Sequence, residues 1–417
     1  MTDMQDSADL GLATTPAADG EAHRFAWHGT GQSLLEAKLN AIAEAQSSVS
    51  METFIFRDSD IGQRFRDALT AAARRGARVR LLVDAVGSFG LRRDYFDELL
   101  AAGGAMRWFN ELRLPSFSFR DHRKLLVVDG EVAFVGGCNI ASEYCGDGIT
   151  TGWRDGGISA RGPVAAVLAA EFDRQWERAT GQRWQFPPGG LRQRVLGGSG
   201  RKVEALFSKP GFGRNPLREA LRRDLATAQD VAITSAYFLP SHRFRRSLAQ
   251  AVARGVRVRL LLAGKSDVPL MQLASRSLYR RLVNKGVEIW EYQPQVLHAK
   301  LIVVDDIVFV GSSNLDPRSL RINFEIMLRI HDAALAATAR RQFEEDLAQR
   351  AISITRAVLQ GHRSWWQRLK QRLAYWLFAR LDAELAALKL QIWQGRKYRF
   401  FQRLHRVRAP ADGGQRS

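Results

Sequence analysis

The stretch 296–325 decides the fold and reads V-L-H-A-K-L-I-V-V-D-D-I-V-F-V-G-S-S-N-L-D-P-R-S-L-R-I-N-F-E. Within it, His298, Lys300 and Asp305 stand at H-x-K-x4-D spacing. Side chains two residues apart project from the same face of an extended strand. The apolar runs on either side of the Asp-Asp pair predict two strands joined by a tight turn. An imidazole beside an ammonium group suits a phosphate, because the imidazole can attack or protonate while the ammonium neutralises oxygens.

The same pattern occurs a second time, with His122, Lys124 and Asp129 in D-H-R-K-L-L-V-V-D-G-E-V-A-F-V-G-G-C-N. Both copies have an apolar–turn–apolar build, and both end in a short glycine-containing segment that closes on an asparagine, Asn139 or Asn314. A single three-residue pattern can arise by chance on a surface strand with solvated side chains. Its repetition within matching flanks indicates a shared function.

Longer flanking segments repeat as well. A-R-R-G-A-R-V-R-L-L-V at 73–83 matches V-A-R-G-V-R-V-R-L-L-L at 252–262, and G-G-A-M-R-W at 103–108 matches K-G-V-E-I-W at 285–290. Helical and strand patterns alternate in both halves, which favours an α/β fold. A repeat of nearly half the chain is too long for a solenoid. The sequence therefore predicts a duplicated α/β protein.

Changes in composition suggest where the parts of the chain begin and end. The N-terminus is small and polar, which is typical of a disordered segment, and a stretch rich in proline and glycine separates the halves as a connector. The predicted parts are a disordered N-terminus (1–24), a first half (25–183, motif 117–144), a linker (184–202), a second half (203–350, motif 293–320) and a basic aromatic tail (351–417).

The chain is strongly basic: among 417 residues, 62 Lys and Arg face 43 Asp and Glu, a net charge of +19. Such a charge predicts an anionic partner, either nucleic acid or a membrane surface. Cys138 and Cys145 offer neither a disulfide framework nor a CxxC pair for zinc, which favours free thiols in a reducing compartment. The N-terminus lacks the basic and apolar regions of a signal peptide. The sequence contains no window of about 18 uninterrupted apolar residues, so no membrane-spanning helix is expected.

Two motifs can form one site. Phosphodiester exchange through a protein nucleophile needs one group that attacks phosphorus and another that protonates the departing oxygen. A pseudo-two-fold axis would place His122 and His298 on opposite sides of one phosphorus. The motif lysines, with Asn139 and Asn314, would then surround the non-bridging oxygens. Such a shell removes the need for a metal, and the sequence contains no HExxH, Walker-A or Cys/His ligand pattern.

A catalytic imidazole also needs a partner that fixes its tautomer. Asp155 in G-W-R-D follows the first motif, and Glu325 in R-I-N-F-E follows the second histidine. We expect these carboxylates to orient the histidines; the alternative is a pair of surface carboxylates. Asp129 and Asp305 are grouped with the catalytic residues, but they fall at predicted turns. Because aspartate at a turn commonly bonds nearby backbone, a structural role is the alternative for both.

The paired H-x-K-x4-D motifs with trailing G-G-C-N and G-S-S-N resemble those of the phospholipase D superfamily. The string G-S-S-N-L-D-P-R-S-L-R-I-N-F-E at 311–325 further resembles bacterial cardiolipin synthases, and the tail resembles that of their B-type. The resemblance implies a mixed β-sheet flanked by helices in each half. It also implies one active site at the pseudo-two-fold interface and no cofactor.

The resemblance also implies an activity. One phosphatidylglycerol would give its phosphatidyl group to a histidine and release glycerol, and a second phosphatidylglycerol would accept the group to form cardiolipin. Because the hydrophobic anchor segments of longer synthases are missing, we expect peripheral attachment to the cytoplasmic face of the cell membrane, with no nucleic acid partner. Two alternatives stay open: hydrolysis of phospholipid or nucleic acid, and a non-catalytic basic binding protein. The nucleophilic histidine, the donor and acceptor lipids and the oligomeric state also stay open.

The tail supports a membrane partner. Residues 356–417 hold fourteen Lys or Arg against three acidic residues. A basic amphipathic helix rich in Trp and Phe is typical of the membrane interface, and we expect this one to bind an anionic leaflet. The alternative is a helix that packs its apolar face on the catalytic core. The apolar positions at helical spacing are Trp366, Leu369, Leu373, Trp376, Leu377 and Leu381.

Overall fold

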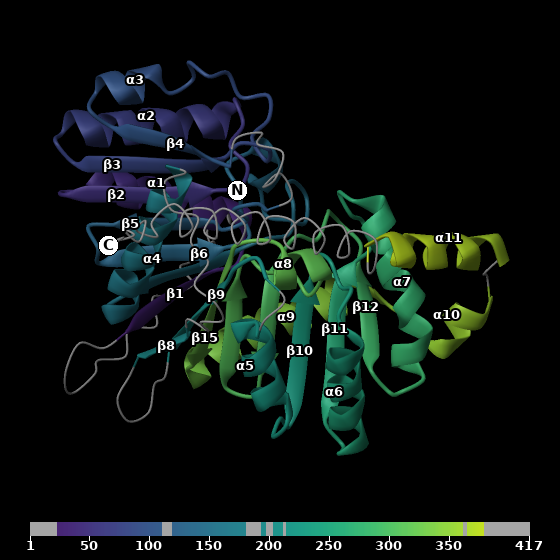
Figure 1. The fold of residues 1–417 in the computed structure, drawn as a ribbon. Coiled ribbons are helices and arrows are strands. Elements are labelled where there is room, and N and C mark those ends of the chain that lie inside the picture. Colours follow the sequence, from purple (N-terminus) through teal and green to yellow (C-terminus); the bar gives the residue numbers. More distant parts are fainter. Residues whose placement is uncertain are drawn as a thin grey trace, which may run out of the picture.

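The computed structural model describes residues 23–110, 119–180, 193–196, 203–211, 214–361 and 365–378. Residues 1–22 of the predicted disordered N-terminus lie outside this part, as do 184–192 and 197–202 of the predicted linker and the tail from residue 379. Figure 1 shows two α/β halves, the first in purple to blue at upper left and the second mainly in green at lower right.

The first half contains a mixed sheet whose described strands run in the order β1-β7-β6-β5-β2-β3-β4. The strand pairs β2–β3 and β3–β4 are parallel and the other pairs are antiparallel. The strands are β1 (Arg24–His28), β2 (Ser48–Thr53), β3 (Arg78–Asp84), β4 (Ala105–Phe109), β5 (Leu125–Val128), β6 (Val132–Gly136) and β7 (Gly157–Arg161). The helices are α1 (Gly31–Glu44), α2 (Asp60–Arg74), α3 (Asp97–Ala101), the 3-10 turn η1 (Ser142–Tyr144) and α4 (Pro163–Ala179).

The second half repeats this order. Its described strands run β16-β12-β11-β10-β13-β14-β15-β9-β8, so the stretch from β9 to β12 reproduces the first sheet strand for strand. The strands are β8 (Gln193–Leu196), β9 (Val203–Ser208), β10 (Asp230–Ser235), β11 (Arg257–Ala263), β12 (Glu288–Tyr292), β13 (Lys300–Val304), β14 (Ile307–Gly311), β15 (Glu325–His331) and β16 (Ala351–Ser353). The helices are α5 (Pro216–Leu225), α6 (His242–Ala253), α7 (Pro269–Val283), α8 (Pro317–Arg321), α9 (Ala333–Arg350), α10 (Arg356–Gly361) and α11 (Trp365–Trp376). The predicted duplicated α/β fold is confirmed, while β8 places a strand inside the predicted linker.

Local sequence accounts for these elements. In α2, the side chain of Ser59 accepts a hydrogen bond from the backbone N–H of Gly62 and so caps the helix. Ile61, Phe65 and Leu69 then recur every four residues and are buried. Gly76 ends the segment with φ +94°, a left-handed conformation in which glycine carries no steric penalty. The chain then enters β3 in register beside β2.

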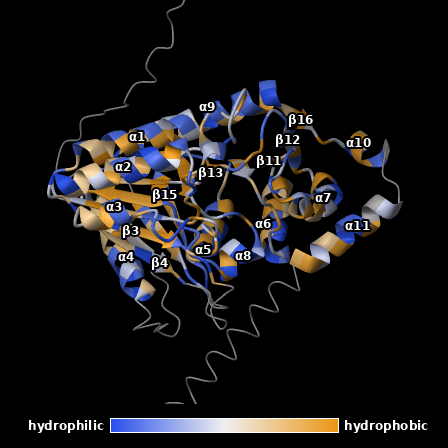
Figure 2. Ribbon diagram, turned by 90° about the horizontal axis from the view of Figure 1, so that it is seen from above, coloured by the Kyte–Doolittle hydropathy of each residue, from blue (hydrophilic) through white to orange (hydrophobic). Residues whose placement is uncertain are grey.

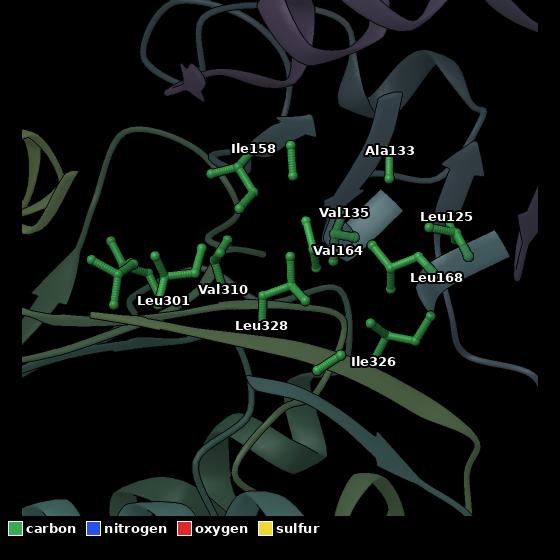
Figure 3. Packing of buried hydrophobic residues seen from close by; sticks show 14 of the residues in the cluster. Leu125, Ala133, Val135, Ile158, Val164, Leu168, Leu301, Val310, Ile326 and Leu328 are labelled. Carbon is green, nitrogen blue, oxygen red and sulfur yellow. The ribbon is translucent and has the colours of Figure 1, made fainter. Parts of the chain in front are cut away.

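One hydrophobic cluster joins the two halves. It contains buried side chains from β5, β6 and β7 of the first sheet and from β13, β14 and β15 of the second. Helices α4 and α9 complete it, since α4 also contacts β9 and α9 also contacts β1. Figure 3 shows this packing around Val135, Ile158, Val310 and Leu328. Each fully buried side chain of this kind contributes about 1.5–3 kcal/mol, so the halves are held in one relative position.

The described part of the tail forms α10 and α11, and α11 packs against α7. Figure 2 shows α11 on the outside of the second half. No helix in the described ranges is both long enough and apolar enough to cross a bilayer.

Candidate active site

Short backbone bridges connect the two halves at the motifs. Asp121 forms a parallel bridge with Phe324. The N–H of His122 donates to the carbonyl of Phe324 at 3.1 Å, and the N–H of Phe324 donates to the carbonyl of Arg120 at 2.9 Å. The first histidine is therefore fixed by backbone of the second half.

An equivalent bridge holds the second histidine. Arg154 pairs with Leu297, its N–H donates to the carbonyl of Val296 at 2.8 Å, and its carbonyl accepts from the N–H of His298 at 2.8 Å. The guanidinium of Arg154 is buried and donates to Asp346 on α9 at 2.8 and 2.9 Å. This ion pair ties the bridge to the body of the second half.

The bridges bring each histidine to a carboxylate of the opposite half. Nδ1 of His122 lies 3.0 Å from Oε1 of Glu325, and Nδ1 of His298 lies 2.6 Å from Oδ2 of Asp155. The sequence analysis associated each carboxylate with the histidine that precedes it in the chain. In the structure each carboxylate instead contacts the histidine of the other motif. Glu325 follows Phe324, which bridges to the segment before His122, and Asp155 follows Arg154, which bridges to the segment before His298. The carboxylates thus hold Nδ1 of each imidazole and not Nε2.

Both carboxylates are held in turn by neighbouring groups. Ser312 donates its hydroxyl to Oε2 of Glu325 at 2.5 Å. At Asp155, the backbone N–H of Gly156 donates to Oδ1 at 2.8 Å. The first-half position that corresponds to Ser312 is Gly137, where a Cβ atom would lie 2.4 Å from Oδ1 of Asp155. Glycine in G-G-C-N and serine in G-S-S-N therefore each suit the carboxylate that they face.

The motif lysines are buried beside the histidines. Nζ of Lys124 donates to the carbonyl of His122 at 2.6 Å, and Nζ of Lys300 donates to the carbonyl of His298. Nζ of Lys300 also lies 3.1 Å from Nε2 of His298. Burial lowers the pKa of Lys300, and it lowers the pKa of Lys124 to about 7 although Glu325 opposes the shift. An anionic phosphate would favour the charged form of both ammonium groups.

Burial also sets the protonation of the paired groups. Burial, then the positive charges of Lys124 and Lys300, holds the pKa of His122 well below its ordinary value. Burial and the charge of Lys300 lower the pKa of His298 as well. Burial raises the pKa of Glu325 to about 7, although Lys124 and the Ser312 hydrogen bond oppose it. Both histidines are thus neutral in the empty site near pH 7, which is the form that can act as a nucleophile or base.

The two motif asparagines are engaged with the protein. Oδ1 of Asn139 accepts from the N–H of Ile55 at 3.1 Å, while its Nδ2 donates to the hydroxyl of Tyr144 at 2.7 Å. Oδ1 of Asn314 accepts from the N–H of Tyr237 at 3.4 Å. The Nδ2 group of Asn139 has a second N–H that can still donate. Phosphate binding by Asn139 and Asn314 stays a prediction.

Asp129 and Asp305 lie at the far ends of the motif hairpins. Both have left-handed backbone, with φ 54° and 50°. The carboxylate of Asp129 accepts from the N–H groups of Gln46, Ser47 and Ser48 at 2.8–3.0 Å. That of Asp305 accepts from the N–H groups that open β10, at residues 229 and 230. Both side chains join a hairpin turn to a neighbouring strand, which favours the structural alternative for Asp129 and Asp305 over a catalytic role.

This position predicts an effect of Asp129→Asn on stability, with activity within about threefold of wild type. Burial raises the pKa of Asp129, but hydrogen bonds from Gln46, Ser48 and Ser47 outweigh it and hold the pKa below its ordinary value. The ionised form therefore adds stability above the unfolded-state pKa, and this stability is lost as pH falls. We expect Asp129→Asn to cost about 1–3 kcal/mol at pH 7 and less in acid, measured by denaturant unfolding.

Glu131→Gln removes an exposed carboxylate from the same turn and is the matched control. It should change neither stability nor activity. Loss of activity in Asp129→Asn at unchanged stability would contradict the structural role.

Aromatic side chains surround the imidazoles, and the sequence analysis missed them. Phe54 lies 5.0 Å from His122 between ring centroids. Tyr144, Trp153 and Tyr237 lie 5.2, 5.6 and 6.5 Å from His298. The available signal was positional, because Phe54 and Tyr237 come one and two residues after β2 and β10, the strands that pair with the motif strands. Among the described residues, no group of three or more His, Cys, Asp or Glu is placed to hold a metal ion.

Comparison with known proteins decides the family. The profile of the family described as "Cardiolipin synthase, PLD-like domain" matches residues 39–176 and 221–347, which contain both motifs. The chain belongs to this cardiolipin synthase family. It is 32% identical over 353 residues to cardiolipin synthase B of Escherichia coli K12, covering 83% of this chain and 85% of that protein. It is 36% identical over 296 residues to a cardiolipin synthase of Geobacillus kaustophilus, covering 68% and 58%.

Solved structures agree on the fold of this cardiolipin synthase family member. The phosphatidylserine synthase of Haemophilus influenzae superposes with a TM-score of 0.67 at 14% identity, over 87% of this chain and 94% of that one. At this identity the likeness concerns the fold alone.

Proposed function

We propose that this protein is a phosphatidyltransferase that makes cardiolipin from two molecules of phosphatidylglycerol and releases glycerol. Membership of the cardiolipin synthase family supports the reaction class. The observation that carries the proposal is the crossed pairing of His122 with Glu325 and of His298 with Asp155. Two imidazoles held through Nδ1 beside two buried lysines supply one nucleophile and one proton donor for a single phosphate.

In the first step, Nε2 of one histidine attacks phosphorus and a P–N bond forms. The phosphate anion, once bound, favours the protonated form of the second histidine. The bond from phosphorus to the glycerol oxygen breaks, and this histidine gives its proton to that oxygen. In the second step, the now neutral second histidine takes the proton of a hydroxyl of another phosphatidylglycerol. The oxygen attacks phosphorus, the P–N bond breaks and cardiolipin leaves, so both histidines return to their starting states.

The surrounding groups fit these steps. When a histidine becomes an imidazolium, its Nδ1–H donates to the carboxylate of Glu325 or Asp155, and the negative charge of that carboxylate stabilises the cation. Lys124 and Lys300 neutralise the non-bridging oxygens, whose charge persists through both transition states. Because these cations come from side chains, the site can stabilise the phosphate without a metal.

Incubation of the purified protein with vesicles of labelled phosphatidylglycerol tests the proposal. The expected products are cardiolipin and free glycerol in equal amounts. Release of phosphatidic acid with no cardiolipin would show that water takes the place of the lipid acceptor. Cleavage of DNA without cardiolipin formation would overturn the lipid substrate altogether.

Helix α11 suggests how the protein reaches its substrate. Its buried side chains include Gln371 and Ala374, on the side that packs against α7. Five apolar side chains instead face outward and are 48–63% exposed: Trp365, Trp366, Leu369, Leu373 and Trp376. Of the other positions of the predicted apolar stripe, Leu377 is half-buried and Leu381 lies outside the described residues. These exposed side chains favour the membrane interface over the alternative that the apolar stripe packs on the catalytic core. We infer that it lies in the interface of an anionic membrane, with exposed Lys370 and Arg372 beside it. Attachment at the cytoplasmic face stays a prediction.

We expect the double variant Leu369→Ser, Leu373→Ser to bind anionic vesicles at least about tenfold more weakly, because inserted leucines contribute about 1.5–3 kcal/mol each when fully buried. Flotation at low salt measures this binding. Deletion of the chain after Thr355 should weaken binding further, because each basic residue near the leaflet contributes about 1 kcal/mol. Leu100→Ser on α3 is the control, since Leu100 is 47% exposed. Unchanged flotation of both altered proteins would refute the attachment.

A further inference from the structure

The duplicated fold gives symmetric catalytic groups but asymmetric walls. Ile55 and Tyr237 occupy equivalent places, because the N–H of each donates to the asparagine of its own motif, Asn139 or Asn314. The backbone of Ile55 and the backbone of Tyr237 therefore make the same hydrogen bond, while the two side chains differ.

On the side of His298 the wall is aromatic and acidic. The ring of Tyr237 stands perpendicular to His298, and its hydroxyl donates to Oδ2 of Asp267 at 2.5 Å. Trp153, which is half-buried, lies on the same imidazole at 5.6 Å. Aromatic rings with a few placed polar groups are typical of sites that fix the orientation of a small polar ligand.

Asp267 is available to a ligand. It is exposed on the segment 264–268 between β11 and α7, and in the described part of the chain its Oδ1 has no hydrogen-bond partner. The segment is anchored, since Nζ of Lys265 donates to the carbonyl of Pro294 at 2.7 Å. The negative charge of Asp267 acts on both His298 and Lys300, which places it near the phosphate site.

On the side of His122 the wall is apolar. Phe54 lies on His122, and Nζ of Lys124 is 5.3 Å from the centroid of the same ring. The segment 85–96, which follows β3 as 264–268 follows β11, carries Phe89 with 77% of its side chain exposed. In the described residues, this wall has no counterpart of the hydrogen bond between Tyr237 and Asp267.

We infer that Tyr237 and Asp267 form the binding site for the two free hydroxyls of the phosphatidylglycerol headgroup, with the lipid-bearing side of the phosphate toward Phe54. The inference rests on the proposed function, because it places the headgroup of that substrate. Oδ1 of Asp267 accepts from one hydroxyl and Oη of Tyr237 accepts from the other, while the aromatic edges pack on the glycerol carbons. The headgroup then leaves beside His298.

Substrate preference provides the measurement. The donor phosphatidylethanol has the same phosphate and lipid as phosphatidylglycerol but lacks the hydroxyls. Both donors are mixed in the same vesicles, so that phosphatidylglycerol is present as acceptor for each. The ratio of kcat/KM for the two donors, measured with the full-length protein as release of labelled glycerol or labelled ethanol, is then independent of whether the product is cardiolipin or phosphatidic acid. Any general effect of a substitution on His298 cancels in this ratio.

We expect wild type to prefer phosphatidylglycerol, and Asp267→Asn and Tyr237→Phe each to lower the preference about tenfold. This is the effect of losing a hydrogen bond to a charged or partly buried partner, about 1.4 kcal/mol. Asp306→Asn removes an exposed carboxylate at the turn between β13 and β14 and should leave the ratio unchanged. Ile55→Val alters the equivalent position on the opposite wall and should also leave it unchanged.

An unchanged ratio in both Asp267→Asn and Tyr237→Phe would overturn the headgroup site, as would a wild type without preference. Failure of the proposed function has a different signature, namely that wild type consumes phosphatidylglycerol but forms no cardiolipin. In that case the ratio still tests the site. A wild type that consumes neither lipid would overturn both.

Discussion

Replacing either His122 or His298 by alanine is expected to reduce cardiolipin formation at least about 1,000-fold, because each substitution removes either the nucleophile or the proton donor. Each imidazole has its own carboxylate, Glu325 for His122 and Asp155 for His298. Because the two histidines have different roles in the reaction, the remaining histidine cannot replace the one that is removed. Thin-layer separation of labelled lipids measures the rate. His331→Ala, at an exposed histidine that ends β15, is the matched control and should retain full activity.

The same variants identify the nucleophile. A rapid acid quench during turnover of phosphatidylglycerol labelled in its phosphate should trap a covalent phosphatidyl-enzyme in only one of them. The variant that still forms this adduct lacks the proton donor, and the other lacks the nucleophile. Cardiolipin formation that persists in either variant would contradict the two-histidine mechanism, and abolition by EDTA with recovery on added divalent ion would contradict its metal-free form.

Glu325→Gln and Asp155→Asn are each expected to lower the rate about 100-fold or more, since an amide cannot stabilise the imidazolium that forms during the reaction. Because burial raises the pKa of Glu325 to about 7, its carboxylate takes up a proton as pH falls through that value. The wild-type rate should therefore decline on the acid side, and Glu325→Gln should lack this decline. A pH–rate profile measures both effects.

The crossed pairing gives these variants a specific spectroscopic signature. Glu325→Gln should change the imidazole NMR signals and titration of His122 and leave those of His298 nearly unchanged, while Asp155→Asn should do the reverse. Gln250→Glu, at an exposed position of α6, controls for a general change in charge. Equal shifts of both histidines in each variant would contradict the pairing across the halves.

Glu325→Gln should lower the activity but keep or raise the stability of the protein above neutral pH. A buried acid whose folded pKa lies above its ordinary value of 4.5 binds its proton more tightly when folded. Wild-type stability from this group therefore falls as pH rises from about 4.5 to about 7, and glutamine has no such dependence. At pH 8 the variant should be at least as stable as wild type, so a loss of rate there reflects chemistry and not unfolding.

The sequence by itself determined the elements that depend on local pattern. The apolar–turn–apolar runs predicted the hairpins β5–β6 and β13–β14, and the repeated flanks predicted two halves of the same strand order. The spacing of the motifs placed each lysine two residues after its histidine, where the chain enters the first strand of each hairpin. These features follow from the period of a strand and from turn chemistry, which act over a few residues.

Only the tertiary structure decided which carboxylate serves which histidine. His122 and Glu325 are 203 residues apart and His298 and Asp155 are 143 apart, so no local rule connects them. The backbone bridges at Phe324 and Arg154 determine which carboxylate lies beside which histidine. The same holds for α11: its sequence specified an apolar stripe, but contact with α7 through Gln371 and Ala374 turned that stripe outward. A helix defines its faces by its 3.6-residue period, whereas the surface it meets decides which face is covered.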